Sequence, residues 1–199
     1  MQQDSLPEID RNFFVYHRMF LAPVEADRLL SALWDQLDWK QHEIMLFGRK
    51  VAQPRLSAWY GDPEARYRYS GLQLEPLPWH PLLLGLKNKL EDHFRQEFNS
   101  VLANAYRDEK DSMGWHSDDE PELGAEPVVA SLSLGSERRF LVRKKGDSHS
   151  SGLALGHGSL LLMKQGCQEI YQHSLPKTRQ QSGLRINLTF RQIVNQFPP

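Results

Sequence analysis

Two histidines and one aspartate stand at positions where they could hold a metal ion. His116 and Asp118 are two residues apart, a spacing that puts both side chains on the same side of an extended strand. Because such a pair is common by chance, its value depends on a third ligand, which His173 supplies farther along the chain. Two imidazoles and a carboxylate favour non-haem Fe(II), since this set leaves coordination positions open for a cosubstrate and O₂. The same set suits a catalytic zinc ion, so these residues alone leave both metals open.

A strand near the C-terminus carries charged and apolar side chains on opposite faces. Between residues 185 and 191, Ile186, Leu188 and Phe190 fall on one face and predict a core contact. The other face carries Arg185, Asn187, Thr189 and Arg191. Two buried guanidiniums are costly unless an anion neutralises them, and a small dicarboxylate fits because guanidinium binds carboxylate through paired hydrogen bonds. A half-exposed strand with surface ion pairs is the alternative interpretation.

Asn104 and Tyr106 share one face of another predicted strand, shortly before the His–Asp pair. Their amide and phenol groups could contact the same anion as the two arginines. The spacing has almost no specificity by itself, so it gains meaning only beside the other two groups.

Two helices and a series of short strands are predicted to position these residues. The first helix follows Pro23 and has the apolar face Leu30, Leu33, Trp34 and Leu37. The second runs from Pro81 toward Phe98 with the stripe Leu83, Leu86, Leu90 and Phe94. After about residue 100, alternating segments over 101–106, 128–134 and 185–191 and an apolar run over 160–163 predict an antiparallel sandwich or barrel. We therefore expect an α+β fold and a single domain over 1–199, with helices and a cover over about 1–99 and a β core over about 100–194.

The region between the helices, residues 41–81, combines aromatic side chains with arginines. The aromatic residues are Phe47, Trp59, Tyr60, Tyr67, Tyr69 and Trp79, and the arginines are Arg49, Arg55, Arg66 and Arg68. This mixture suits stacking on bases while phosphates are held. A hairpin-rich cover over the core is the alternative interpretation.

Composition excludes several classes of protein. The chain has 199 residues, of which 40% are hydrophobic and 25% are charged. This composition is typical neither of a disordered protein nor of a membrane-spanning one. The single Cys167 excludes an internal disulfide and any CxxC motif. The net charge of −1 gives no overall basic field, although local basic clusters could follow phosphates. The first residues do not resemble a secretory signal, so we expect a soluble intracellular protein, cytoplasmic or nuclear, that is monomeric and not bound to membranes.

Taken together and in this order, the motifs resemble the AlkB family of Fe(II)- and 2-oxoglutarate-dependent dioxygenases. The likeness covers about residues 44–194. Further segments resemble the branch that repairs alkylated double-stranded DNA, namely His116 to Glu120, Ala130 to Gly135, His157 to Leu160, His173 to Pro176, Pro54 to Asp62 and Tyr67 to Gly71. The resemblance implies a double-stranded β-helix (jelly-roll) core with N-terminal supporting helices and a nucleotide-recognition lid of hairpins.

The resemblance also implies a role for each matched residue. The iron ligands would be His116, Asp118 and His173. The 2-oxoglutarate would bind Arg185 through its far carboxylate, with further residues of its site at Asn104, Tyr106, Asn187, Thr189 and Arg191. The substrate would meet Phe47, Gly48, Arg49, Arg55, Tyr67, Arg68, Tyr69, Ser70 and Asp119. Within this set Tyr67 and Tyr69 would flank a flipped base, and Phe47 would enter the gap that the base leaves in the duplex.

The implied activity is oxidative demethylation of 1-methyladenine and 3-methylcytosine in duplex or single-stranded DNA. O₂ and 2-oxoglutarate would be converted to succinate and CO₂, with release of formaldehyde. A methyl group inside a stacked duplex is out of reach, so the base must be extruded. The alternatives are demethylation of RNA, hydroxylation of a protein or small molecule by the same iron core, and a non-catalytic nucleic-acid-binding module with a structural metal. Arg185 and Arg191 argue against the last, because a structural zinc site needs no anion pocket.

Overall fold

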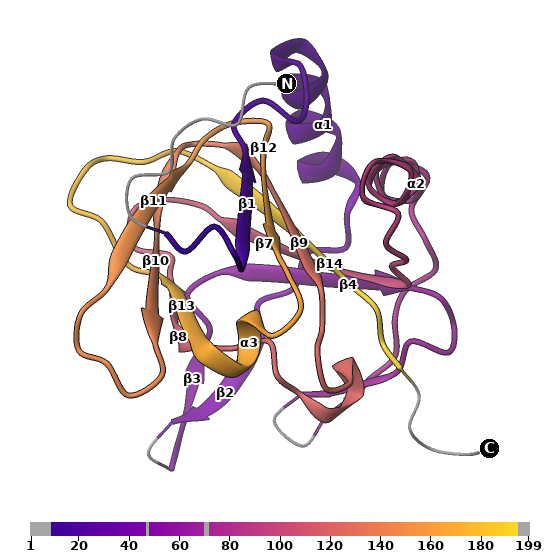
Figure 1. The fold of residues 1–199 in the computed structure, drawn as a ribbon. Helices are drawn as coiled ribbons and strands as arrows, with labels where there is room; N and C mark the ends of the chain where they lie inside the picture. Colours follow the sequence, from indigo (N-terminus) through magenta and orange to yellow (C-terminus); the bar gives the residue numbers. More distant parts are fainter. Residues whose placement is uncertain (1–8, 47, 70–71, 195–199) are drawn as a thin grey trace.

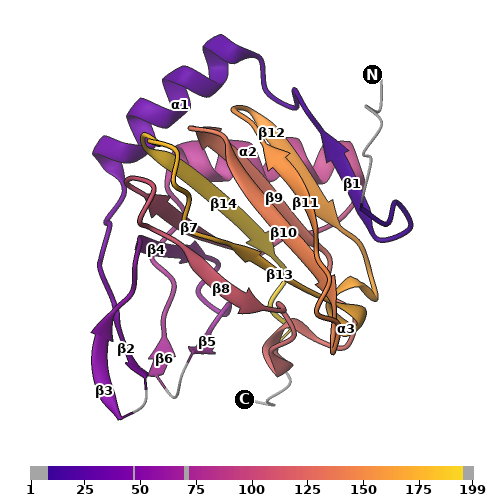
Figure 2. The same ribbon diagram turned by 90° about the vertical axis from the view of Figure 1, so that its left-hand side faces the viewer.

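Two antiparallel sheets lie against each other, and two long helices cover one of them (Figures 1 and 2). The computed structural model describes residues 9–46, 48–69 and 72–194. Its helices are α1 (Pro23–Gln36), α2 (Pro81–Phe94) and the short α3 (Cys167–Ile170), with a 3-10 turn at Pro121–Leu123. The predicted α+β class is confirmed, and the two sheets are consistent with a double-stranded β-helix.

The larger sheet has six strands in the order β1-β12-β9-β14-β7-β4. These strands are β1 (Phe14–His17), β12 (Ser159–Met163), β9 (Val129–Gly135), β14 (Arg185–Arg191), β7 (Ser100–Tyr106) and β4 (Leu56–Gly61). The smaller sheet has the order β11-β10-β13-β8. Its strands are β11 (Ser151–Leu155), β10 (Arg138–Lys144), β13 (Tyr171–Leu175) and β8 (Met113–His116). Two separate hairpins consist of β2 (Glu43–Leu46) with β3 (Arg49–Ala52) and β5 (Tyr67–Tyr69) with β6 (Leu72–Leu74).

Both long helices begin at a proline, which needs no hydrogen-bond acceptor in the first helical turn. In α2 the Nδ1 atom of His80 also accepts the backbone N–H of Leu82 at 3.3 Å. The helix ends because Arg95 adopts the left-handed conformation, with φ at 55°. It therefore stops at Phe94 rather than near Phe98, and Phe98 is a buried core residue beyond the helix.

Three residues of the predicted apolar face of α1, Leu30, Leu33 and Leu37, contact the core, and Trp34 does not. Its fully buried side chains are Ala26, Leu29 and Leu33. Trp34 was expected on that face, but it is 38% exposed and contacts Trp39 instead. The small side chain at Ala26 lets the helix approach the turn at Gly158, where an added Cβ would lie 3.4 Å from the Ala26 methyl.

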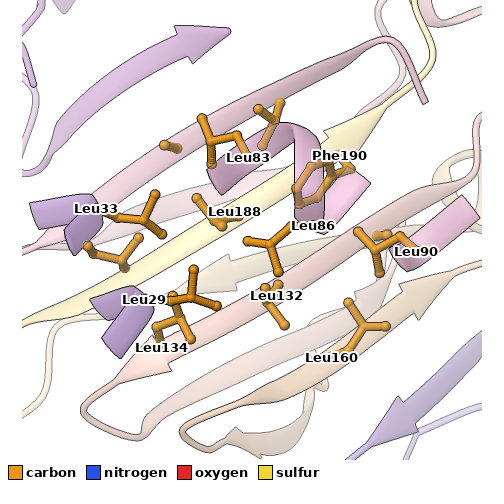
Figure 3. Close-up of a cluster of buried hydrophobic side chains, with 14 of the residues drawn as sticks. Leu29, Leu33, Leu83, Leu86, Leu90, Leu132, Leu134, Leu160, Leu188 and Phe190 are labelled. Carbon is orange, nitrogen blue, oxygen red and sulfur yellow. The ribbon is translucent and has the colours of Figure 1, made fainter. Parts of the chain in front are cut away.

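The main apolar core lies between the two helices and the outer face of the six-stranded sheet. Figure 3 shows the leucines of both helices pointing onto the central strands. The labelled side chains are Leu29, Leu33, Leu83, Leu86, Leu90, Leu132, Leu134, Leu160, Leu188 and Phe190. Burial of one such side chain contributes about 1.5–3 kcal/mol, so this layer supplies much of the stability that fixes the central strands.

Strand β14 lies in the middle of the sheet between β9 and β7. All of its residues are buried, and Asn187 pairs with Asn104 of β7 on one side and Ser133 of β9 on the other. The predicted alternation is confirmed, because Ile186, Leu188 and Phe190 belong to the helix-side core. The polar side chains of β14 therefore face the smaller sheet.

Two strands from the N-terminal half complete the six-stranded sheet. β1 pairs with β12 at one edge, and β4 pairs with β7 at the other. The expected division into N-terminal helices and a C-terminal β core thus does not describe the sheet itself. The alternative interpretation of residues 41–81 as a hairpin-rich cover is wrong for β4, which belongs to the six-stranded sheet and has buried Trp59 and Tyr60 side chains, whereas β2–β3 and β5–β6 are hairpins outside both sheets. Among the described residues, no helix has the length and apolar character needed to cross a bilayer.

Candidate metal and anion site

His116, Asp118 and His173 come together between the two sheets. β8 ends at His116, which pairs with His173 on β13, and Asp118 follows in the loop after β8. The prediction that both His116 and Asp118 lie on a strand is thus wrong for Asp118. One nitrogen or oxygen atom from each of the three side chains lies within 4.8 Å of the others. This arrangement can hold one metal ion from one side and leave its other positions open.

Each imidazole can present a nitrogen lone pair to a metal. His116 Nδ1 lies 2.9 Å from the carbonyl oxygen of Gly114. That contact is a hydrogen bond when Nδ1 carries the hydrogen, which leaves Nε2 as the metal-binding atom. Burial, together with the neighbouring His116, lowers the pKa of His173 to about 3, although Asp118 opposes the shift. His173 is therefore neutral at physiological pH, the form that binds metal.

Asp118 is held by Arg191 from the end of β14. Arg191 Nη2 donates to Oδ1 of Asp118, and Oδ2 of the same carboxylate lies 3.6 Å from Nε2 of His173. Burial alone would raise the pKa of Asp118, but Arg191 and then His173 outweigh it, so the pKa is lowered. The carboxylate is thus ionised at neutral pH. Of the two arginines predicted to need an anion, Arg191 has a carboxylate partner within the protein.

Arg185 retains open hydrogen-bonding capacity inside the pocket. Its side chain is buried, and Nη2 donates to the Ser133 hydroxyl at 2.8 Å. Among the described residues, the buried Nε of Arg185 has no hydrogen-bond partner. Burial lowers the pKa of Arg185 to about 10, so the guanidinium remains charged at neutral pH. A buried, charged donor without a partner fits a carboxylate ligand, such as one end of 2-oxoglutarate.

The remaining predicted anion residues are ordered by hydrogen bonds across the strands. Asn187 Nδ2 donates to the Ser131 hydroxyl at 2.8 Å, and its Oδ1 accepts from the Thr189 hydroxyl at 3.1 Å. Arg55 Nε donates to Oδ1 of Asn104 at 3.1 Å. Asn187 is thus engaged within the sheet, whereas Arg55 fixes the orientation of the Asn104 amide.

One pocket between the sheets collects every residue predicted for the metal and the anion. Its lining includes Asn104, Tyr106, His116, Asp118, His173, Arg185, Asn187, Thr189 and Arg191. Tyr106 lies beside Arg185, with the guanidinium carbon 5.3 Å from the ring centroid. The His–Asp–His cluster and the buried Arg185 guanidinium therefore share one enclosure, and their donor atoms fit Fe(II) and a small dicarboxylate.

Four of the residues predicted to bind substrate, Gly48, Arg49, Arg55 and Asp119, are not among the described residues that line this pocket. Gly48 and Arg49 are at the turn of the exposed β2–β3 hairpin, where Gly48 has a φ of 76°. Arg55 is buried beneath Asn104 rather than exposed. Asp119 is half exposed and forms an ion pair with Lys145 at 2.8 Å.

The other predicted substrate residues belong to the second hairpin or fall outside the described residues. Tyr67, Arg68 and Tyr69 form β5, which pairs with β6. Phe47 and Ser70 lie outside the residues that the structure describes. In Figure 2 both hairpins lie at the same end of the molecule, below the sheets.

Sequence reasoning did not single out several side chains that build the site. Ser131 and Ser133 of β9 hold Asn187 and Arg185, and the alternation of small polar residues within a buried strand could have revealed them. Phe140 stacks on His173 at 5.2 Å between ring centroids. Gln168 accepts the backbone N–H of Asp118. No local pattern marks Phe140 or Gln168, because their roles depend on contacts between distant segments.

The comparisons with known proteins agree with one another. The family model described as the 2OG-Fe(II) oxygenase superfamily matches residues 13–191. The human protein "DNA oxidative demethylase ALKBH2" is 36% identical over 189 residues, which cover 89% of this chain and 72% of that protein. The human protein "Alpha-ketoglutarate-dependent dioxygenase alkB homolog 3" is 44% identical over 184 residues, covering 87% of this chain. The chain spans 64% of the length of that human relative and 62% of its bovine counterpart.

A solved structure entitled "The structure of OsALKBH1" has a similar fold. Its TM-score is 0.66 at 19% sequence identity, and the match covers 93% of this chain and 100% of that chain. At this identity the likeness supports the arrangement of helices and sheets only.

Proposed function

Because the chain belongs to the 2OG-Fe(II) oxygenase superfamily and to its AlkB family, we propose that it removes alkyl groups oxidatively from nucleic-acid bases. Its cofactors are Fe(II) and 2-oxoglutarate. The substrates we propose are 1-methyladenine and 3-methylcytosine in DNA. The observation that carries the proposal is the shared pocket, in which a His–Asp–His triad lies beside the buried, incompletely hydrogen-bonded Arg185.

The residues of the pocket divide into two groups in this proposal. His116, Asp118 and His173 would hold the iron. Arg185 would bind the far carboxylate of 2-oxoglutarate, and the contacts along its length would come from Asn104, Tyr106, Thr189 and Arg191. Asn187 would act indirectly, since its amide is already engaged with Ser131 and Thr189.

The protein's contribution to the chemistry is to hold, orient and exclude water. When bound, Fe(II) supplies the O₂-dependent oxidation in which 2-oxoglutarate becomes succinate and CO₂. One oxygen atom enters a C–H bond of the N-methyl group, and the resulting N–CH₂OH breaks at the C–N bond to release formaldehyde and the unmodified base. Arg191 keeps Asp118 ionised throughout, and the buried position of His173 excludes water from its side of the pocket.

The two hairpins supply the substrate side of the proposal. We assign β2–β3 and β5–β6 as a nucleotide-recognition lid on a jelly-roll core, with Tyr67 and Tyr69 flanking the extruded base. Arg49, Arg68 and Ser70 would contact the strand around the base. All four residues of β3 are exposed, so Arg49 is accessible to a phosphate. A base that carries a positive charge after N-methylation would be attracted to the aromatic faces and to Asp119, which is half exposed.

Arg55 and Gly48 have supporting parts in this assignment. Arg55 would reach the substrate only through its contact with Asn104, because its own side chain is buried. Gly48 supplies the positive φ that the hairpin turn requires next to Phe47. The proposal includes a monomer acting inside the cell, where nucleic acid and ferrous iron occur together.

The decisive experiment uses mass spectrometry on oligonucleotides that contain one 1-methyladenine, as single strands and as duplexes. The protein is supplied with Fe(II), 2-oxoglutarate and O₂, and the expected result is the loss of one methyl group that depends on 2-oxoglutarate. Succinate formation without loss of the methyl group would contradict DNA repair and direct attention to methylated RNA or to a protein substrate. Neither product, with a metal bound, would favour a structural metal site in a nucleic-acid-binding module.

The role proposed for Phe47 is tested by Phe47→Ala on the same oligonucleotides. Because the side chain would occupy the gap in a duplex, activity on duplex DNA should fall far more than activity on single strands. Equal losses on both substrates would remove Phe47 from that role.

A further inference from the structure

A buried glutamine reaches the backbone of the metal-binding loop. Gln168 on α3 accepts the backbone N–H of Asp118 through Oε1 at 3.0 Å. Its side chain is buried, and its Nε2 donates to Met163 Sδ at 3.5 Å. A thioether is a weak acceptor, so the strong hydrogen bond of this amide is the one to Asp118.

The neighbouring residue of the same loop is tied to the same segment. Ser117 Oγ donates to the carbonyl oxygen of Tyr171 at 2.9 Å. The Tyr171 hydroxyl donates in turn to Oδ2 of Asp10 at 2.9 Å. Two hydrogen bonds thus join residues 117–118 to residues 168–171, and this second segment leads directly into β13 and His173.

These contacts connect Asp118 with the segment that leads to His173. No strand pairing aligns these two residues with each other. His116 is aligned with His173 because β8 pairs with β13 at that point. Asp118 lies beyond the end of β8, and the described strand pairings do not include it. Arg191 fixes one oxygen of its carboxylate, but the position of its main chain depends on the loop contacts.

We propose that Gln168 is a positioning residue that holds the Asp118 main chain in register with His173, so that the metal site exists before the metal arrives. The inference rests on the iron site of the proposed function and not on the nucleic-acid substrate. Partners of metal ligands commonly change metal affinity by about 10- to 100-fold when they are removed. Gln168 contacts the backbone of Asp118 and not its carboxylate, so its effect on the metal is less direct. We therefore expect its removal to lower the metal affinity about tenfold.

The test compares Gln168→Met with Gln172→Met in the full chain. The Gln168 variant keeps the length of the side chain but removes the acceptor of the Asp118 N–H. The control makes the same chemical change on β13, where Gln172 accepts hydrogen bonds from Arg143 instead of from the loop of Asp118. Gln168→Asn is a gentler variant, because it keeps a buried amide that is one methylene too short to reach.

The measurements are the affinity for Co(II) in the presence of 2-oxoglutarate, by titration calorimetry, and the visible absorption of the bound Co(II). Melting temperatures of the metal-free proteins are recorded in parallel. We expect about tenfold weaker Co(II) binding and altered Co(II) absorption for both Gln168 variants, and parental values for Gln172→Met. Parental Co(II) affinity in either folded Gln168 variant would overturn the proposal, as would an equal loss in Gln172→Met.

Hydrogen exchange in the parent protein provides a further test that does not depend on any variant. In the metal-free state the amide hydrogen of Asp118 should exchange slowly with solvent, because Gln168 already accepts it. Rapid exchange that slows only after Co(II) binding would mean that the metal, rather than Gln168, orders the loop. Because none of these measurements involves a nucleic acid, their outcome is separate from the question of which base the enzyme repairs.

Discussion

The two faces of β14 are equally buried but chemically opposite. On the helix side, Ile186, Leu188 and Phe190 are wholly inaccessible and pack among leucines. On the side of the smaller sheet, Arg185 and Arg191 are also nearly inaccessible, at 2% and 6% exposure. Burial therefore does not separate core from site in this protein. The difference is whether each buried group has a partner within the chain.

On the apolar face the side chains pack only against other side chains of the protein. On the polar face Arg191 donates to the carboxylate of Asp118, whereas Arg185 donates to the hydroxyl of Ser133 and has no carboxylate partner among the described residues. The apolar face therefore stabilises the fold, and we propose that the polar face binds ligands. Substitutions on the two faces should separate stability from ligand binding.

The largest effect is expected from His116→Ala on the polar side. Loss of one of the three proposed metal ligands should reduce 2-oxoglutarate turnover to that of metal-free protein, as measured by succinate formation. His149→Ala is the control, because His149 is exposed in the loop after β10. Substantial turnover by His116→Ala would mean that the metal is held elsewhere.

Leu188→Ala tests the apolar face of the same strand. Deleting a wholly buried leucine should lower the free energy of unfolding by about 2–5 kcal/mol, measured by urea denaturation. The KM for 2-oxoglutarate should stay near the parental value below the unfolding transition. A large change in KM without loss of stability would show that the two faces are not separable.

Arg185→Ala makes the reciprocal change on the polar face. Loss of a charge-assisted contact worth about 1.5–3 kcal/mol should raise the KM for 2-oxoglutarate about 10- to 100-fold. The KM of Arg185→Lys should lie between those of the parent and Arg185→Ala, because a lysine keeps the charge but lacks the planar pair of donors. An unchanged KM in Arg185→Ala would exclude this residue from the carboxylate site.

The smallest effect concerns an aromatic cluster that belongs to neither face. Burial, and then the neighbouring His93, lower the pKa of His17 below its ordinary value of 6.5. The unfolded chain thus binds a proton more readily than the folded one below about pH 6.5, so this residue destabilises the fold as pH falls. His17→Phe keeps a ring beside Phe94 and His93 but cannot titrate.

The check on His17 is the free energy of unfolding of parent and His17→Phe between pH 7.5 and pH 5. The parent should lose more stability over this interval than the variant does. Parallel curves for the two proteins would show that protonation of His17 has no part in the acid sensitivity.

The sequence predicted those features that depend on local periodicity. The alternation of β14 and the proline starts of both helices are visible in single segments, and the structure confirms them. The apolar face of α1 is predicted correctly except at Trp34, which is apolar but 38% exposed, whereas the small residue Ala26 is wholly buried. The sequence leaves open whether the β4 segment is part of a cover, because its aromatic residues suit a rim as well as a core.

The parts of the site that could not be predicted are contacts between segments far apart in the chain. Arg191 and Asp118 are separated by 73 residues, and Gln168 and Asp118 by 50. Nothing in either local sequence indicates which buried charge neutralises which. The candidate metal-binding side chains can be proposed from their types and spacing, whereas their hydrogen-bond partners can be identified only from the fold.

The pairing of β1 with β12 has a consequence for how the protein folds. Phe14 lies opposite Met163, about 150 positions away along the chain, and Met163 also lines the metal pocket. A contact of such long range closes a large loop, so its entropic cost delays its formation. We therefore expect the N-terminal strand to dock late during folding. Until it does, β12 is an open edge available to another chain, which makes newly synthesised protein prone to aggregate before its metal pocket is complete.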